Sequence, residues 1–581
     1  MRLLFRLAAL LLISAGGSTP ASAERPAYPA VVSADTVEAP VTAERAMVVS
    51  GHPEASRIGV RVMREGGNAV DAAVATAFAL AVVLPDAGNV GGGGFLLWRG
   101  ADGATTSFDF RETAPEAATR DMFLDSRGRV VPGRSTRGHL AAGVPGTVAG
   151  LLLAHERLGS LPLERLMEPA IALARDGQRL TGRNAFLFNR YRRDFERFES
   201  TARVFVREDG EPWQITDRFR QPDLARVLER VRDEGHDGFY RGATADLIVA
   251  EMERGGGLIT HEDLAGYRAI ERPVLEGRYR GRRVLTMGPP SAGGIALLQT
   301  LRAMEPYALR DMGFHSPAHV HLTGEALRRA FADRARWLGD PDRVEVPALA
   351  LIDSAYVAQR MADFDPDAAT ASRAIAGGEP WTEGTETTHL SVVDAEGNTV
   401  ALTTTINDYY GSKVVVDGAG FLLNNEMDDF ASTPDAPNLW GLVQGDANAI
   451  APGKRMVSSM TPTIVEDKTG RLAMVTGSPG GARIISTVLA SIVNVFDFGM
   501  DAQTAVTLPR FHHQWLPDEL EYERGVPDST LSALRARGWR LDRLSRFGAA
   551  NVIVVRDGAD GSRTLEGGAD PRRDDNDARG F

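Results

Sequence analysis

The chain has 581 residues, is 43% hydrophobic, carries a formal net charge of -12 at pH 7 and contains no cysteine. A chain of this size can bury a large core, and its acidic balance argues against a nucleic-acid partner, which needs a concentrated basic face. The lack of cysteine excludes disulfides, thiol catalysis and a lipid-modified cysteine.

Residues 1–23 are typical of a secretory signal peptide, with two arginines, an apolar run from Leu7 to Ile13 and small residues at 21–23. The run is shorter than the ~20 residues of a membrane-spanning helix, so no stable membrane anchor is expected. Residues 24–46 are rich in Ala, Pro and Val and are interpreted as a linker. We therefore predict a periplasmic or secreted protein.

The first element expected in the folded body is a nearly all-apolar helix between Glu65 and Pro85, capped by Asn68 or Asp71. Gly91–Gly94 follow it. Because glycine permits positive φ and close backbone approach, this run suits a tight passage beside an active centre. A phosphate-binding loop is not expected, since no Gly-Lys-Ser or Gly-Lys-Thr follows.

Residues 151–267 show the three- and four-residue apolar spacing of helices, and another helix is expected over residues 315–338. That helix carries His319 and His321, whose i, i+2 spacing places them on different sides. Adjacent His512 and His513 diverge in the same way. We predict no metal site at either pair and no organic cofactor.

From residue 388 onward strands dominate. Residues 391–395 and 399–405 are predicted to form two strands with a turn at 396–398, a helix is expected after Ser478, and residues 551–557 return to strand. Alternating helix-rich and strand-rich segments indicate sheets covered by helices. Because threonine is common in strands, periodicity alone predicts only a strand position for Thr387.

Several colinear motifs give a sharper prediction. They include TTHLSVVDAEGNTVALTTTIN, NNEMDDF, RMVSSMTPTIV and GSPGGARI, preceded by GHPEAS, DFRETAP, AAGVPGTVAGL and RRAFADRARWLGDPD and followed by DPRR. Together they resemble the γ-glutamyltranspeptidases, or glutathione hydrolases, which are N-terminal nucleophile hydrolases. The resemblance covers nearly all of the chain. It implies an α+β fold, the four-layer αββα sandwich, built by two self-cleaved subunits: residues 47–386 and the catalytic residues 387–581.

The resemblance implies that Thr387 cleaves the chain after Glu386 and then acts as the nucleophile. Its freed α-amine would be a base with a pKa of ~7.7–8.0 beside the hydroxyl. The hydroxyl would take the glutamyl group of glutathione or a related γ-glutamyl donor as an ester and pass it to water or to an amino acid or peptide. Thr405 would hydrogen-bond the nucleophile, and Gly480 and Gly481 would donate N–H groups to the oxyanion.

The same resemblance assigns the donor's α-carboxylate to Arg111, whose guanidinium can donate two parallel hydrogen bonds, together with Ser458 and Ser459. It assigns the donor's ammonium to Asn407, Glu426 and Asp429. Trp440 occupies the lid position, where bacterial relatives carry a tyrosine, so acceptor preference is open.

Two alternatives remain at this point. A cephalosporin or glutaryl amide acylase of the same fold is favoured by Trp440 and opposed by Asp429, because a glutaryl side chain has no ammonium to neutralise that carboxylate. The alternative of another class is an unprocessed, inactive binding or structural protein that has kept the fold.

Overall fold

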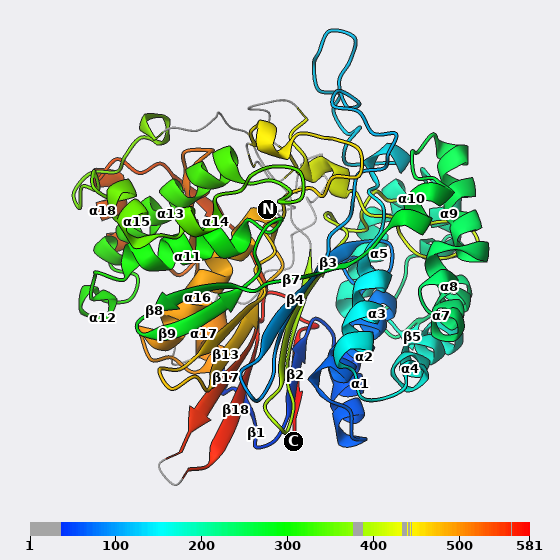
Figure 1. Ribbon diagram of the computed structural model, residues 1–581, viewed down its shortest axis with the longest axis horizontal. Helices are drawn as coiled ribbons and strands as arrows, with labels where there is room; N and C mark the ends of the chain where they lie inside the picture. Colours follow the sequence, from blue (N-terminus) through cyan, green and yellow to red (C-terminus); the bar gives the residue numbers. More distant parts are fainter. Residues whose placement is uncertain (1–36, 376–386, 433–437, 440–441, 443, 559–560) are drawn as a thin grey trace, which may run out of the picture. The chain divides into compact units, whose positions relative to one another are not determined.

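Two seven-stranded antiparallel sheets lie face to face, and helices cover the outer face of each (Figure 1). The computed structural model describes residues 37–375, 387–432, 438–439, 442, 444–558 and 561–581, which belong to one compact unit. This arrangement confirms the predicted four-layer αββα sandwich. Among the described residues, no helix is both long and apolar enough to cross a membrane.

The first sheet has the order β1 (Val41–Ala43), β18 (Arg563–Ala569), β17 (Asn551–Asp557), β13 (Leu472–Gly477), β12 (Thr463–Glu466), β9 (Arg282–Thr286) and β8 (Leu275–Tyr279). The second has the order β19 (Asp577–Gly580), β2 (Met47–Ser50), β10 (Thr388–Val393), β11 (Thr399–Thr405), β3 (Gly93–Arg99), β4 (Thr105–Phe110) and β7 (Ile270–Arg272). Smaller sheets join β5 (Gln178–Arg179) to β6 (Arg218–Phe219), and β14 (Phe511–His512) to β15 (Leu520–Glu523) and β16 (Leu541–Leu544).

The helices beside the second sheet come mainly from the region predicted to be helical. They are α1 (Pro53–Arg64), α2 (Ala69–Val83), α3 (Thr147–Leu158), α4 (Leu163–Asp176), α5 (Gly182–Phe195), α6 (Glu199–Phe205), α7 (Pro222–Glu234), α8 (Asp237–Tyr240), α9 (Gly242–Gly255) and α10 (His261–Gly266). The first-sheet side carries α11 (Gly293–Met304), α12 (Leu309–Met312), α13 (Pro317–Trp337), α14 (Ala348–Leu351), α15 (Ser354–Arg360), α16 (Ile484–Phe496), α17 (Ala502–Thr507) and α18 (Asp528–Ala536).

Alternation along the strands divides the apolar side chains between layers. On β10, Leu390 and Val392 pack with the helices of the second sheet, whereas Val393 belongs to the cluster between the sheets. On β17, Val552 and Val554 pack with the helices of the first sheet and Ile553 faces the other sheet. Because successive strand residues point to opposite faces, each sheet can bury both of its faces.

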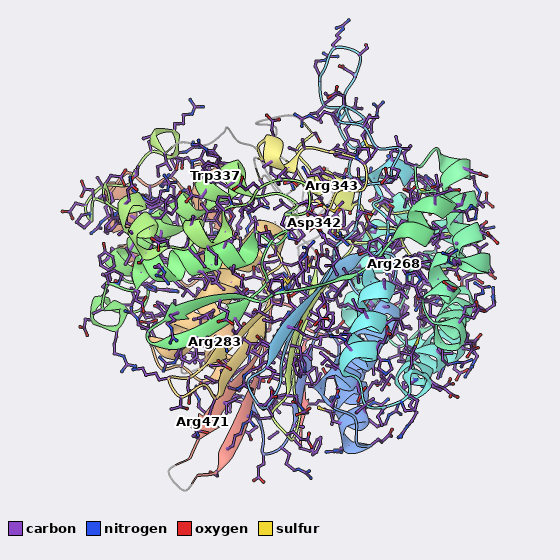
Figure 2. All side chains as sticks on the ribbon, in the orientation of Figure 1. Arg268, Arg283, Trp337, Asp342, Arg343 and Arg471 are labelled. Carbon is purple, nitrogen blue, oxygen red and sulfur yellow. The ribbon has the colours of Figure 1, made fainter. Side chains whose placement is uncertain are left out.

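Charged side chains gather instead at the sheet margins. Arg283 on β9 donates to Glu466 at 3.0 Å, and Arg471, which directly precedes β13, pairs with Asp557 at 2.8 Å (Figure 2). The Arg471–Asp557 pair keeps contact with water and costs little desolvation, whereas Glu466 is buried and is shared by Arg283 and Arg99.

Helix α2 confirms the predicted buried helix. Asn68 is its N-cap: the side chain accepts from the backbone N–H groups of Val70 and Asp71, and Asp71 accepts from the N–H of Asn68 in return. This capping box satisfies N–H groups that have no partner inside the helix. All residues of α2 are buried, which explains why it needs no polar face.

Segments from both sides of residue 387 share one sheet. The hairpin β10–β11 is inserted between β2 and β3, and the C-terminal β19 pairs with β2 on its other side.

The predicted linker of residues 24–46 is wrong in its last part: β1, Val41–Ala43, pairs with β18 and buries Ala43. A three-residue edge strand is too short to give a readable alternation.

The histidine pairs are structural groups in separate surroundings. On α13, the Nδ1 atom of His319 accepts from the backbone N–H of His315, whereas His321 accepts from the indole N–H of Trp539. His512 bonds Ser486, and His513 accepts from the N–H of Trp515. Within the described part of the chain, no group of three or more His, Asp or Glu side chains could hold a metal ion.

Candidate active site

The hairpin of β10 and β11 brings two threonine hydroxyls together at one end of the second sheet. The strands pair with Thr388 opposite Thr404, and the Thr387 hydroxyl donates to the Thr405 hydroxyl at 3.3 Å. The Thr405 oxygen also accepts from the backbone N–H of Asn407 at 2.8 Å. The predicted pair is therefore in contact, and Glu386 lies outside the described residues.

The turn of this hairpin is fixed by one carboxylate. Asp394 Oδ1 accepts from the backbone N–H groups of Glu396, Gly397 and Asn398 at 3.1, 2.9 and 2.8 Å. Gly397 has φ +94°, which glycine adopts without steric cost. The turn sets the register of the strands, and the register decides which hydroxyl faces Thr387.

The backbone next to the hydroxyl pair is approached very closely by the glycine run. A Cβ atom on Gly92 would lie 2.0 Å from the carbonyl oxygen of Thr405, and one on Gly94 would lie 2.3 Å from that of Thr403. Only glycine fits this spacing. The predicted tight passage beside the site is confirmed.

His389 shares the strand face of Thr387 but is a fixed neutral group. Its Nδ1 bonds the Thr403 hydroxyl at 2.8 Å and its Nε2 bonds the Ser391 hydroxyl at 3.1 Å. Complete burial lowers the pKa of His389 to about 3, so the ring is uncharged at neutral pH. Both ring nitrogens are used in packing the hairpin, so His389 does not supply a base beside Thr387.

The opposite side of the site is a buried charge cluster centred on Arg111. Its Nη1 donates to Glu426 at 2.6 Å and, at 3.4 Å, to Glu112; its Nη2 donates to Asp429 at 2.5 Å. The remaining N–H groups reach the carbonyl oxygens of Met456 and Val457, both at 3.3 Å. Every guanidinium donor is therefore engaged with the protein.

Burial and charge oppose each other in this cluster. Desolvation works against the charge on Arg111, but Glu426, Glu112 and Asp429 outweigh it and raise the arginine's pKa. Desolvation raises the pKa of Glu426 well above its usual range and the pKa of Glu112 to about 7. It also raises the pKa of Asp429. The positive charge of Arg111 opposes all three shifts. Among the described residues, one carboxylate oxygen each of Glu112 and Glu426 has no hydrogen-bond partner. The cluster is thus suited to receive an added cation.

A second buried cation, Arg334 on α13, lies on the same side. Its Nη2 donates to the Ser459 hydroxyl at 3.3 Å, while its Nε has no partner among the described residues. Desolvation lowers the pKa of Arg334 to about 10, although Asp429 opposes this shift, so the guanidinium stays charged at neutral pH. The Ser458 hydroxyl accepts from the N–H of Met460 at 3.1 Å and shapes the turn that holds the serine pair.

Gly480 and Gly481 begin the helical segment that faces the hydroxyl pair. Their φ values are +133° and +55°, and the 3-10 turn Gly481–Arg483 runs directly into α16. The first N–H groups of a helix have no partner within it and lie at the positive end of its dipole. Gly481 lines the pocket, and Gly480 adjoins it without lining it.

Asn438 and Leu439 are attached to the cluster by Asp428 and Asp429. Asp428 accepts from the N–H of Leu439 and from the Ser135 hydroxyl, both at 2.6 Å, and Asn438 donates to Asp429 at 2.9 Å. Desolvation raises the pKa of Asp428 to about 7. Trp440 itself lies outside the described residues.

These groups surround one pocket with about 280 Å³ of empty volume. Its lining is Arg111, Thr387, Thr405, Asn407, Glu426, Asp429, Leu442, Ser458, Ser459, Met460, Gly481 and Ile484. A second cavity of about 380 Å³, between α11, α13 and α16, is mainly apolar. Ser486 in its lining bonds Nδ1 of His512, whose pKa burial lowers well below its usual range. The first pocket is the one that gathers the residues that the sequence singled out.

Sequence reasoning missed two residues of this region, Arg334 and Arg573. Arg573 donates from Nη1 to the Thr387 carbonyl oxygen at 2.9 Å. Both arginines lie inside motifs that carried the resemblance, RRAFADRARW and DPRR, but nothing in those motifs indicates which side chain turns inward. Asn407 has φ +74°, a strained value for a residue other than glycine, and its side chain donates to the Asn425 carbonyl at 2.9 Å.

A family model, named relatives and a solved structure all match this chain over most of its length. Residues 55–580 match the family model described as gamma-glutamyltranspeptidase. The chain is 45% identical over 579 residues to a glutathione hydrolase proenzyme of Escherichia coli (strain K12), covering 99% of each chain. It is 38% identical over 544 residues to acylase ACY 1 proenzyme of Pseudomonas sp. (strain SE83), covering 92% of this chain and 93% of that protein. A cephalosporin acylase structure from Bacillus halodurans matches with a TM-score of 0.81 at 25% identity, covering 94% of this chain and 97% of that one.

Proposed function

The chain belongs to the γ-glutamyltranspeptidase family, and from that premise we propose that Thr387 is the nucleophile of a self-processing γ-glutamyl hydrolase and transferase. The enzyme class is that of the N-terminal nucleophile hydrolases. The contact between the Thr387 and Thr405 hydroxyls, at 3.3 Å in a pocket shared with Arg111 and Asp429, is the observation that carries the assignment of residues.

Processing begins when the Thr387 hydroxyl attacks the carbonyl carbon of Glu386. The peptide C–N bond breaks, the acyl group moves to the threonine oxygen as an ester, and the nitrogen becomes a free amine. Water then hydrolyses the ester and leaves two chains, residues 47–386 with any retained linker and residues 387–581, as a heterodimer. Thr405 supports this step by holding the attacking oxygen.

In turnover the Thr387 amine accepts the proton of its own hydroxyl, and the oxygen attacks the donor's γ-carbonyl carbon. N–H groups of Gly480 and Gly481 stabilise the oxyanion, and donors of this kind typically contribute about 3–4 kcal/mol. The leaving amine takes the proton as the γ-glutamyl ester forms. Water or an acceptor amine then attacks the ester and restores the hydroxyl.

The charged side of the pocket holds the α-carbon end of the donor. We assign the donor ammonium to Asp429, Glu426 and Asn407, because the two carboxylates exceed the charge of Arg111 and, among the described residues, one oxygen of Glu426 has no hydrogen-bond partner. The donor carboxylate is placed against Arg111 with Ser458 and Ser459. Since Arg111 already donates to Glu426 and Asp429, donor binding requires it to share or exchange those bonds.

Acylase activity is the second candidate, supported by the 38% identity to acylase ACY 1 proenzyme. A glutaryl side chain would enter the same pocket without an ammonium and would leave the carboxylates of Asp429 and Glu426 uncompensated. Comparing γ-glutamyl-p-nitroanilide with glutaryl-p-nitroanilide separates the two functions. We expect faster turnover of the glutamyl compound, and exclusive turnover of the glutaryl compound would reject the assignment.

Glutathione as donor, an amino acid or peptide as acceptor and a periplasmic or secreted location belong to the same proposal. The signal-like residues 1–23 support export, and they lie outside the described residues.

The direct test of the nucleophile is Thr387→Ala, with Thr388→Val as a matched control. The Thr388 hydroxyl is buried and has no partner among the described residues, so its isosteric replacement removes no hydrogen bond. We expect Thr387→Ala to remain a single chain and to lose activity on the order of 10³-fold or more. Thr388→Val should be cleaved and active. Full activity in Thr387→Ala would reject the proposal.

A further inference from the structure

Arg573 lies in the loop between β18 and β19, and its neighbour Arg572 fixes that loop. Arg572 donates to Glu523 and to the carbonyl oxygens of Val506 and Leu508, at 2.8 and 3.0 Å for the two carbonyls. Since adjacent side chains diverge, this anchoring turns Arg573 to the other side, toward the second sheet. There its Nη1 donates to the Thr387 carbonyl oxygen at 2.9 Å.

This contact acts on the reacting residue itself. The carbonyl oxygen and the nitrogen of one residue are joined through Cα and C and lie at most ~3.6 Å apart. The guanidinium charge of Arg573 is therefore within about 6.5 Å of the nitrogen that becomes the free amine. A fixed carbonyl also restricts rotation of the Thr387 backbone, which determines where its hydroxyl points.

The other charges around Arg573 form a compact group behind the hairpin. Arg183 donates to both oxygens of Asp86, at 2.8 and 2.6 Å, and Asp575 accepts from the Thr181 hydroxyl at 2.8 Å. Arg183, Asp86 and Asp575 all interact electrostatically with Arg573. With Arg573 the group is formally neutral, and without it the group would carry one negative charge.

Burial lowers the pKa of Arg573 to about 9, so it keeps its proton at neutral pH. Across the pocket the amine faces Arg111, Glu426 and Asp429, and on its own strand the nearest titratable side chain is the neutral His389. Arg573 differs from Arg111 in that its guanidinium donates directly to the backbone of Thr387.

We propose that Arg573 is a positioning residue for the nucleophile: it holds the Thr387 carbonyl and favours the neutral, base-competent form of the Thr387 amine. This rests on the proposed role of Thr387. A positive charge close to an amine disfavours its protonation, so the amine remains a base at a lower pH than it would in the absence of Arg573. The expected shift is ~1 pH unit, because the aspartates partly offset the charge.

The test is the pH dependence of kcat/KM for γ-glutamyl-p-nitroanilide in Arg573→Gln, Arg573→Lys and wild type. The acidic limb reports protonation of the free enzyme's base. In Arg573→Gln the acidic limb should move to higher pH by ~1 unit, and much of the loss in kcat/KM should be recovered on the alkaline plateau. Arg573→Lys should return the acidic limb toward its wild-type position. Arg579→Gln, an exposed arginine paired with Asp577, is the control and should match wild type.

A uniform loss at every pH with an unshifted limb would overturn the proposal, because a purely structural role would act that way. If Arg573→Gln stays uncleaved, Arg573→Lys decides: a cleaved, active lysine variant supports the proposal, and an uncleaved one overturns it. Failure of the nucleophile assignment is distinguishable, since it would appear as activity in Thr387→Ala.

Discussion

The two sides of the pocket are equally buried but are built by opposite means. The side chains of the hydroxyl side, Thr387 with Thr405 and His389, are neutral, and their hydrogen bonds to one another and to Thr403 lie within a single hairpin. The charged side collects Arg111, Glu426 and Asp429 from separate segments and holds like charges together. Under the proposed function, the difference separates a nucleophile held by neutral hydroxyl contacts from a donor-binding side whose charges are only partly satisfied by the protein.

The charged side should be the more sensitive to a conservative change. Arg111→Lys keeps the charge but replaces five fixed donors with three on a flexible stem, so at least two of the five acceptors lose their donor and the carboxylate pairs lose their fixed geometry. We expect kcat/KM for γ-glutamyl-p-nitroanilide to fall by ~10²–10³-fold, since breaking a buried pair costs ~3–5 kcal/mol. Arg283→Lys, at the sheet margin, is the control. A loss in kcat/KM below threefold in Arg111→Lys would mean that the charged side is not the more sensitive of the two to a conservative change.

Asp429→Asn removes the charge to which we assign the donor ammonium, while it keeps the size of the side chain. We expect a loss of ~10²-fold in kcat/KM for the glutamyl compound, seen chiefly in KM, because removing one partner of a buried charge pair costs ~2–5 kcal/mol. Turnover of glutaryl-p-nitroanilide should change much less, since that substrate has no ammonium. Equal losses for both compounds would contradict the placement of the ammonium at Asp429.

On the hydroxyl side a single deletion should be milder. Thr405→Val removes one hydroxyl at constant shape, and a neutral hydrogen bond is worth ~0.5–1.5 kcal/mol, which corresponds to a loss of ~2–12-fold in kcat. Precursor cleavage, followed on a denaturing gel, should slow as well. Thr399→Val, on the same face of β11 but bonded to the Gly397 carbonyl in the turn, is the matched control. Unchanged cleavage and turnover in Thr405→Val would remove Thr405 from the mechanism.

Asp428 links the charged side to the backbone of Leu439 and gives the smallest effect, one on stability. Its pKa is raised by burial to about 7 from 3.8, so between these values the unfolded chain has lost a proton that the folded chain retains. Stability from this group therefore falls as pH rises through that window. We measure the free energy of unfolding by urea at pH 4 and at pH 7. From the lower to the higher pH, its change should be more favourable in Asp428→Asn than in wild type by ~1 kcal/mol or more.

The control for Asp428 is Ser135→Ala. It removes the hydroxyl that donates to Asp428 at 2.6 Å and that lowers the pKa of Asp428, but it keeps the titrating carboxyl, so its stability should still fall as pH rises from 4 to 7. Parallel slopes for Asp428→Asn and wild type would contradict the raised pKa.

The hydroxyl side could be predicted from sequence to a large extent because its contacts are local. The alternation of residues 399–405 and the turn at Gly397 predict the hairpin, and the hairpin places Thr387 opposite Thr405. The apolar run and capping residues of α2 are likewise local signals. The resemblance supplied the roles of these residues, which periodicity could not.

The charged side and the outer contacts could be predicted only in part. The resemblance named Arg111, but not that the protein's own carboxylates would occupy its donors. Arg334 and Arg573 reach partners 125 and 186 residues away, and such contacts depend on how the layers pack. The short strand β1 was missed because its pairing with β18 leaves no pattern in three residues.

The central claim is that Thr387 becomes an N-terminal residue and only then a catalyst. Its most direct test is N-terminal sequencing and intact mass measurement of the smaller fragment of the purified enzyme. The account predicts a fragment that begins Thr387-Thr388-His389 and accompanies γ-glutamyl transfer. A fragment with another start, or full activity in an uncleaved chain, would contradict it.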